Sequence, residues 1–306
     1  MKNLSKDRQQ AAKAFIFSHA RPLEQAFYRH EFESAPREDA LIELARFQNA
    51  DGGFGQALEP DFRAPESSSY TTGIALDMLR EINAPADHPL IRGAMAYLLH
   101  TYQRETQTWR IIPPTGDASP HAPWWNQDRL EETFKHFRVN PKAELVSYFY
   151  RYESAISPNE QDEMLASLLV DVEKLPDAVS VDELLCLLRL HACETLPAEA
   201  RSYLRERLTK MILATVEMNP EKWGGYCLKP LWAVTSPNAP FADIIRPALE
   251  QNLDYEIDRQ NEDGSWSPNW SWFGQFPEEW PTAEREWRGV LTLRMLRTLK
   301  AFGRVE

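Results

Sequence analysis

The chain has 306 residues, a formal net charge of −12 and 43% hydrophobic residues, so it is long enough to bury a substantial core. The acidic balance argues against a nucleic-acid-binding protein and against electrostatic docking on anionic lipid, since both need a basic surface. Three cysteines are too few for a disulfide framework, and there is neither a signal-like N-terminus nor an apolar window of about 18 residues, so we expect a soluble cytoplasmic protein without a membrane span.

Helix signals run along the whole chain. In chain order we predict helices over residues 5–19, 21–33, 37–50, 70–83, 88–104, 126–138, 141–153, 198–218 and 241–260. Three more helices are expected, one after Ser157, one after Ser180 and one that ends near Phe302. No segment shows sustained apolar–polar alternation between hairpin turns, so strands should be few. About twelve helices make the predicted fold class all-α.

Three of these helices carry more specific signals. Ser157 and Ser180 each begin a capping box, in which a glutamate follows the serine three residues later. The segment after Ser180 is apolar nearly all round, which predicts an inner helix that is buried on two sides. The last helix carries Leu293, Leu296 and Leu299 with basic residues between them, which predicts an amphipathic surface helix.

One turn sequence recurs between the helices. Residues 48–54 read Gln-Asn-Ala-Asp-Gly-Gly-Phe, residues 260–266 read Gln-Asn-Glu-Asp-Gly-Ser-Trp, residues 103–109 form a decayed copy, and residues 222–226 are a candidate fourth. The three glutamines are 55 and 157 residues apart, and the second spacing is about three steps of 52. Such a period indicates stacked helical hairpins, of which six would fill the chain. We therefore predict a single domain over residues 1–306, an (α/α)6 toroid of about six helical hairpins.

The repeated polar residues are interpreted as architecture. The glycine after the aspartate supplies the positive φ that ends a helix, and the glutamine can hydrogen-bond the backbone of the turn. A catalytic residue needs to appear only once. The repetition therefore assigns Gln48, Asp51, Gln260 and Asp263 to the repeat rather than to catalysis.

These turns resemble the Gln-Trp repeats of squalene–hopene cyclases, and through them the α-α toroid superfamily of terpenoid cyclases and protein prenyltransferase β-subunits. Residues 52–61 and 120–125 are also similar to a group of uncharacterised bacterial proteins described as prenyltransferase-like. The resemblance implies a central cavity for an isoprenoid-type ligand. It describes a fold and not an established reaction.

The reactive motifs of that superfamily are absent from the sequence. It contains neither the Asp-x-Asp-Asp acid of protonation-triggered cyclases nor the Asp-Asp-x-x-Asp motif that holds magnesium and diphosphate. His191 and Cys193 are two positions apart on an apolar helix, point in different directions, and lack the upstream Asp-x-Cys partner of the prenyltransferase zinc site. We therefore predict no metal and no cofactor.

Three long connections follow turns of the same phase and should emerge on one rim of the toroid. They comprise residues 51–69, 105–126 and 262–281. On these loops Glu59 and Asp61 are candidate acid–base catalysts, because burial can split the pKa values of two carboxyl groups. His121 is a third candidate, since histidine exchanges protons near neutral pH. The alternative for each is structural: a carboxylate that accepts backbone amides, or a histidine that donates a hydrogen bond.

The same loops carry candidate ligand contacts, since tryptophan offers a large flat apolar area. They are Arg63, Trp124, Trp125, Trp266, Trp270 and Trp272. The alternatives are that Arg63 pairs with Glu59 or Glu66 and that the tryptophans pack the rim. We expect the acid–base and ligand-contact residues to face one shared cavity.

Three functions remain open from the sequence. The first is a terpenoid-cyclase-like or prenyltransferase-like protein that acts on or binds an isoprenoid, the second is a carbohydrate-active enzyme, and the third is a non-catalytic binding or scaffold module. An aromatic and aliphatic cavity lining would favour the isoprenoid. Polar side chains beside a tryptophan plane would favour a sugar, and a filled centre would favour the scaffold. The expected partner is a small hydrophobic or sugar ligand, and the oligomeric state is left open.

Overall fold

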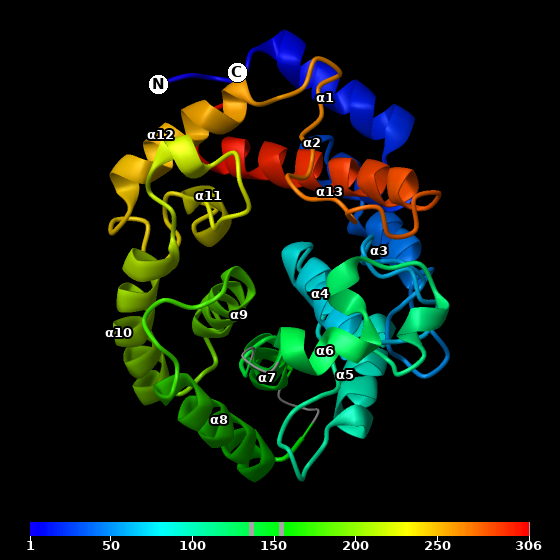
Figure 1. Ribbon diagram of the computed structural model, residues 1–306, viewed down its shortest axis with the longest axis vertical. Helices are drawn as coiled ribbons and strands as arrows, with labels where there is room; N and C mark the ends of the chain where they lie inside the picture. Colours follow the sequence, from blue (N-terminus) through cyan, green and yellow to red (C-terminus); the bar gives the residue numbers. More distant parts are fainter. Residues whose placement is uncertain (135–137, 153–155, 306) are drawn as a thin grey trace. The chain divides into compact units, whose positions relative to one another are not determined.

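The computed structural model describes residues 1–134, 138–152 and 156–305. Within these ranges it contains 13 α-helices and no strand, which confirms the all-α prediction (Figure 1). Isolated β-bridges join some of the loops. Over the same residues, no helix combines the length and the apolar character that crossing a membrane requires.

The chain divides into two compact units, which we describe separately. Unit 1 comprises residues 1–43 and 215–306, and unit 2 comprises residues 44–214. Unit 1 holds α1 (Lys6–His19), α2 (Pro22–Phe32), α3 (Arg37–Ala45), α11 (Pro230–Ala233), α12 (Arg246–Asp258) and α13 (Trp280–Ala301). Unit 2 holds α4 (Ser69–Glu81), α5 (Pro89–Thr101), α6 (Gln127–Phe134), α7 (Lys142–Arg151), α8 (Pro158–Glu173), α9 (Val181–His191) and α10 (Ala198–Thr215). The boundaries fall in the last turn of α3 and at the end of α10, and a single domain over the whole chain stays a prediction.

The predicted helices correspond to α1–α10, α12 and α13, and the structure adds the four-residue α11. The ends differ most at α3, which stops at Ala45, and at α12, which begins only at Arg246. Phe241, where the prediction placed the start of α12, has a φ of 70°, which is outside the helical region. Predicted helical positions 135–137 and 153 lie outside the described residues.

Both predicted capping boxes are formed. In each, the serine hydroxyl accepts the backbone N–H of the glutamate three residues on, and the glutamate side chain accepts the backbone N–H of the serine. The box at Ser180 opens α9, and none of the residues of α9 is fully exposed. Five of its 11 residues are buried and the others are partly buried, so burial on two sides stays a prediction.

The prediction of a surface helix at the C-terminus is wrong. Among the 22 residues of α13, only Pro281, Arg285, Lys300 and Ala301 are exposed. The helix packs against α1 and α2, and another of its faces lines a pocket. The three-residue spacing of the leucines predicted one buried face of α13. It did not predict the second face, which lines the pocket.

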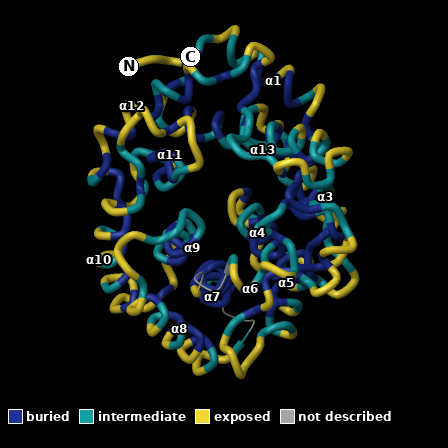
Figure 2. The backbone as a smooth tube through the Cα atoms, viewed as in Figure 1, coloured by how far each residue is buried: buried dark blue, intermediate teal, exposed yellow. Residues whose placement is uncertain are grey.

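The core of unit 2 is built around α7. Every residue from Lys142 to Tyr150 is buried, and α7 packs against α4, α5, α8 and α9. Figure 2 shows α7 in the colour of buried residues. The buried ammonium of Lys142 lies 2.7 Å from the carboxylate of Asp171, which compensates its charge.

In unit 2 the repeated turn links the end of α3 to α4. The side-chain amide of Gln48 donates a hydrogen bond of 2.8 Å to the carbonyl of Gly52 and one of 3.0 Å to the carbonyl of Leu90, in the first turn of α5. One glutamine side chain therefore both closes its own turn and holds a neighbouring helix.

In unit 1 the second copy makes the same bonds. The side-chain amide of Gln260 donates at 2.8 Å to the carbonyl of Gly264 and at 3.0 Å to the carbonyl of Arg8, in the first turn of α1. Asp51 and Asp263 also act alike, since each accepts the backbone N–H two residues on, at 3.0 and 3.1 Å. The architectural interpretation of these glutamines and aspartates is confirmed.

The glycine of this turn is required twice over. Gly52 and Gly264 have φ values of 86° and 88°, which L-residues rarely adopt. A Cβ on Gly52 would lie 2.4 Å from the carbonyl oxygen of Gly93, and one on Gly264 would lie 2.2 Å from the carbonyl carbon of Ala11. Glycine therefore allows the turn to touch the backbone of the helix that the glutamine holds.

The weaker copies differ from each other. In the copy at residues 103–109, the indole of Trp109 folds back and donates at 2.7 Å to the carbonyl of Leu98, while Gln107 takes the positive φ in place of glycine. The candidate copy at residues 222–226 is not one, because Tyr226 is 63% exposed and does not fold back on the core.

Candidate functional site

Two of the three predicted loops meet in unit 2. Phe62 and His121 form an antiparallel β-bridge. The backbone N–H of Ala122 donates to the carbonyl of Asp61 at 2.8 Å, and that of Arg63 donates to the carbonyl of Pro120 at 3.0 Å. The structure thus brings the three predicted acid–base residues onto one pair of joined loops.

The two predicted carboxyl groups are both buried. Glu59 is 4% exposed and Asp61 is 3% exposed. The carbonyl of Glu59 accepts the backbone N–H of Phe62 at 3.1 Å, which closes a turn with Pro60 in its second position. Burial, and next the negative charge of Glu59, raise the pKa of the Tyr70 phenol well above its ordinary value. Glu59 therefore influences the titration of a neighbouring buried group.

His121 is held within its own loop. Its Nδ1 lies 2.6 Å from the carbonyl oxygen of Ser119, and its Nε2 lies 2.8 Å from Oδ1 of Asn126 and 3.6 Å from Oδ1 of Asp117. A carbonyl oxygen only accepts, so Nδ1 is a donor. This arrangement supports the structural alternative for His121.

The aromatic residues of these loops pack against the unit itself. Trp125 is 3% exposed, and its ring centroid lies 4.9 Å from that of Tyr70 and 5.9 Å from that of Phe62. Trp124 and Arg63 are half-buried. Trp125 therefore fits the rim-packing alternative, and Trp124 is the more accessible of the two indoles.

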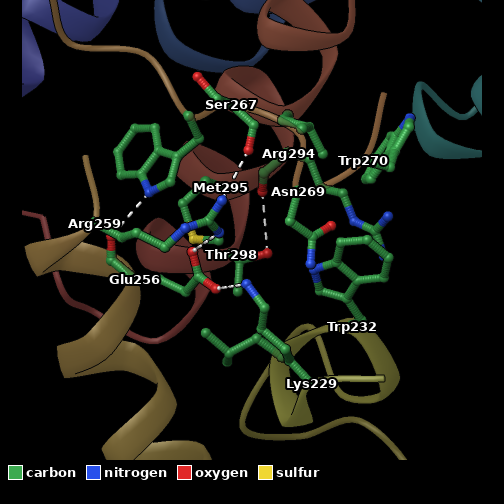
Figure 3. A pocket seen from close by; sticks show the side chains of 13 residues that line it. Lys229, Trp232, Glu256, Arg259, Ser267, Asn269, Trp270, Arg294, Met295 and Thr298 are labelled. Atoms are coloured by element: carbon green, nitrogen blue, oxygen red, sulfur yellow. Dashed lines mark hydrogen bonds and ion pairs between the residues drawn. The ribbon is translucent and has the colours of Figure 1, made fainter. Parts of the chain in front are cut away.

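The predicted tryptophans of the third loop belong to unit 1. Trp266 and Trp270 line a small pocket, which Figure 3 shows from close by. Trp272 is fully buried and packs on Phe276 and Trp280, with ring centroids 6.4 and 5.8 Å apart. A cavity that these residues share with the loops of unit 2 stays a prediction.

The floor of this pocket is a buried charged network. The ammonium of Lys229 lies 2.6 Å from Oε1 of Glu256, and the two side chains are 1% and 2% exposed. Arg259 donates to Oε2 of Glu256 at 3.3 Å and to the carbonyl of Ser267 at 2.9 Å. Burial lowers the pKa of the Lys229 ammonium, and the charge of Glu256 opposes that shift. Figure 3 shows Lys229 and Arg259 reaching the Glu256 carboxylate from two sides.

The wall of the pocket is aromatic. The indoles of Trp232 and Trp270 are half-buried and nearly perpendicular, with an interplanar angle of 89° and centroids 6.4 Å apart. The guanidinium of Arg294, from α13, lies 5.2 Å from the centroid of the Trp232 ring, within the range of a cation–π contact. Trp287, about two turns before Arg294 on α13, extends this cluster with a centroid 5.1 Å from that of Trp270.

The pocket is small. Its volume is about 30 Å³, room for one or two water-sized groups. Ser267, Asn269 and Thr298 add polar atoms to its lining. Asn269 is positioned by a hydrogen bond of 2.6 Å from its side-chain amide to the carbonyl of Gly225.

Most of this pocket escapes prediction from the sequence. Lys229, Trp232, Glu256, Arg259 and Arg294 were not predicted as site residues, whereas Trp266 and Trp270 were. Glu256 did carry a signal, because it lies on the same helical face as the buried Leu249 and Leu253. A charged residue on an apolar stripe is either paired or functional. Lys229 carried none, since it lies in a segment without helical periodicity.

Neither a metal site nor a similar protein indicates a function for this chain. Among the described residues, no group of three or more His, Cys, Asp or Glu side chains is placed to hold a metal ion. No protein-family model matches the chain, and comparison with curated proteins finds no similar sequence. The functional argument therefore rests on the chemistry of the pocket.

Proposed function

We propose that this chain is a ligand-binding protein of the α-α toroid type, and that the pocket of unit 1 takes a polar ligand with one flat apolar face, as a sugar ring has. One observation carries the proposal: the half-buried indoles of Trp232 and Trp270 line the same pocket as the buried ion pair of Lys229 and Glu256. Ligand sites commonly combine aromatic walls with a few fixed polar groups.

The lining supports a sugar over an isoprenoid at this pocket. An isoprenoid chain offers no acceptor for the ammonium of Lys229 or the side chain of Asn269, so it would displace water from polar groups without replacing the hydrogen bonds. A sugar offers hydroxyl groups for the floor and a C–H face for the indoles. The isoprenoid ligand that the turn sequences implied remains the alternative.

The volume limits how such a ligand would bind. A cavity of about 30 Å³ does not enclose a ring. The ring would lie on the indole of Trp232, with Trp270 perpendicular beside it and one polar substituent entering the cavity toward Lys229. Binding, rather than catalysis, is what the lining supports, because Glu256 is the one acidic residue among the described residues that line the pocket, and two cations hold it. Glycosidases of the common types use two carboxyl groups.

The closed toroid is supported by contacts within unit 1. The turn at residues 260–266 is followed by α13 and holds α1, just as the turn at residues 48–54 is followed by α4 and holds α5. The first helix of the chain thus completes the last hairpin. An open stack of hairpins does not need this pairing, whereas a ring does.

Saturation-transfer NMR tests the ligand class. We expect D-glucose and D-galactose to receive saturation from the protein, and farnesol, as the isoprenoid probe, to receive none. Trp232→Ala should abolish the sugar signals. Trp280→Phe, at a half-buried tryptophan outside the pocket lining, is the matched control and should keep them. Transfer to farnesol alone would favour the isoprenoid alternative, and transfer to neither probe would leave the scaffold reading.

A further inference from the structure

We infer that the ligand group entering the unit 1 pocket is a carboxylate, so that the ligand is an acidic sugar rather than a neutral one. This inference rests on the proposed function and names the ligand class for the same site. It follows from the donors, the charge and the size of the cavity floor.

The first step concerns hydrogen-bond donors. The ammonium of Lys229 has three N–H groups. Among the described residues, Glu256 is its hydrogen-bond partner, and the ring of Tyr255 lies 5.3 Å from the nitrogen. The side chain is 1% exposed, so bulk water does not satisfy the other N–H groups. Because Lys229 lines the cavity, a ligand oxygen placed there would accept from it.

The second step concerns charge. One carboxylate, that of Glu256, lies between the two cations Lys229 and Arg259. Lys229 and Glu256 are shielded from water, where Coulomb interactions are stronger than at the surface, and the Arg259 side chain is 29% exposed. The floor therefore carries a net positive charge. An anionic group compensates this excess, and a hydroxyl group does not.

The third step concerns size. About 30 Å³ accepts one or two water-sized groups, which matches the two oxygens of a carboxylate. The phosphoryl group of a sugar phosphate has three terminal oxygens and is larger. A sugar whose ring lies on Trp232 and whose carboxylate points to Lys229 satisfies all three observations, as a uronic acid does.

The test compares D-glucuronate with its methyl ester, which keeps the ring and removes the charge. We expect the acid to bind at least about tenfold more tightly than the ester, because one hydrogen bond to a charged group strengthens binding by about this factor. Equal binding of acid and ester would overturn the inference and leave the proposed function in place. Tighter binding of glucose 6-phosphate than of glucuronate would overturn the assignment to a carboxylate. If none of these sugars binds, the proposed function fails as well.

A variant tests whether the preference for the acid over the ester depends on Lys229. Lys229→Met removes the donor and the excess charge, while Glu256 keeps Arg259 as its partner. We expect the preference for the acid to fall below about twofold, with ester binding unchanged. Lys222→Met, at a lysine of unit 1 that is 67% exposed, is the control and should keep the preference. The comparison of acid and ester on the unaltered chain stands even where Lys229→Met fails to fold. A preserved preference in a folded Lys229→Met protein would contradict the assignment.

Discussion

The side-chain amide of Gln260 lies 3.0 Å from the carbonyl oxygen of Arg8, 252 positions earlier in the chain. Arg8 returns the contact, because its Nε donates at 2.7 Å to Oε1 of Gln260. Gln48 makes the corresponding bond to a helix only 42 positions later. The same local device therefore joins consecutive hairpins in one place and the two ends of the chain in another.

Replacing Gln260 by alanine should lower the free energy of unfolding by about 1–3 kcal/mol. The substitution leaves the carbonyls of Gly264 and Arg8 without their donor in a buried turn. Urea denaturation measures the change. Gln251→Ala, at an exposed position of α12, should stay within about 0.5 kcal/mol, and an equally small change at Gln260 would contradict the architectural role.

Two glycines with the same backbone conformation separate strain from crowding. Gly264 and Gly274 both have a φ of 88°, but a Cβ on Gly264 would meet the backbone of α1 at 2.2 Å, whereas one on Gly274 would meet nothing within 4 Å. Gly274→Ala should cost about 1–2 kcal/mol from the left-handed conformation alone. Gly264→Ala should cost clearly more in the same thermal unfolding experiment, and equal losses would show that the close approach is not important.

Asp263 predicts a pH dependence of stability. Burial opposes the shift, but hydrogen bonds from Ser265 and then the Arg288 guanidinium lower the pKa of Asp263 below its usual 3.8. The carboxylate therefore stabilises the folded chain above the unfolded pKa, and this contribution is lost as the pH falls through the lowered folded value. Asp263→Ala should unfold more easily at pH 7 by about 1 kcal/mol, with the difference shrinking below about pH 3.8. Asp243→Ala, at a side chain that is 88% exposed, should change the stability at pH 7 by no more than about 0.5 kcal/mol.

A circular permutant should fold. The backbone N–H of Leu4 donates at 2.8 Å to the carbonyl of Arg304, so a short glycine–serine linker can join the ends, and new termini can open in the exposed loop after Asp177. Circular dichroism should show an unchanged helix content and one cooperative transition. Deletion of residues 1–20 should instead abolish cooperative unfolding of unit 1, because it removes the helix that Gln260 holds. A stable deletion variant would refute the closure.

Asp61→Asn tests the predicted acid–base pair. If Asp61 belongs to a ligand site and not to a structural network, the variant should keep its stability within about 1 kcal/mol. If Asp61 takes part in chemistry, hydrolysis of p-nitrophenyl glycosides by the unaltered chain should disappear in the variant. A loss of about 0.5–2 kcal/mol with unchanged turnover would instead identify Asp61 as a structural cap.

Features that depend on neighbours along the chain could be predicted from the sequence. The capping boxes at Ser157 and Ser180 formed as expected, because a serine and a glutamate three residues apart bond within one turn of helix. The turns at Gln48 and Gln260 did so too, since the glutamine reaches the carbonyl four residues on. Where a helix begins depends on contacts beyond its own turn. The sequence therefore did not predict that α12 starts only after Phe241, whose φ of 70° is not helical.

Only the tertiary structure decided where charge is buried. Lys229 and Glu256 are 27 residues apart and meet because α11 packs on α12, a contact that neither segment signals by its own periodicity. The amphipathic pattern predicted that Arg294 faces solvent on the last helix, whereas packing places its guanidinium on the ring of Trp232. Turn and cap bonds are set by sequence separation, whereas the desolvation of an ion depends on which distant segments cover it. The repeated turns could therefore be predicted from the sequence, whereas the pocket depends on how distant segments pack together.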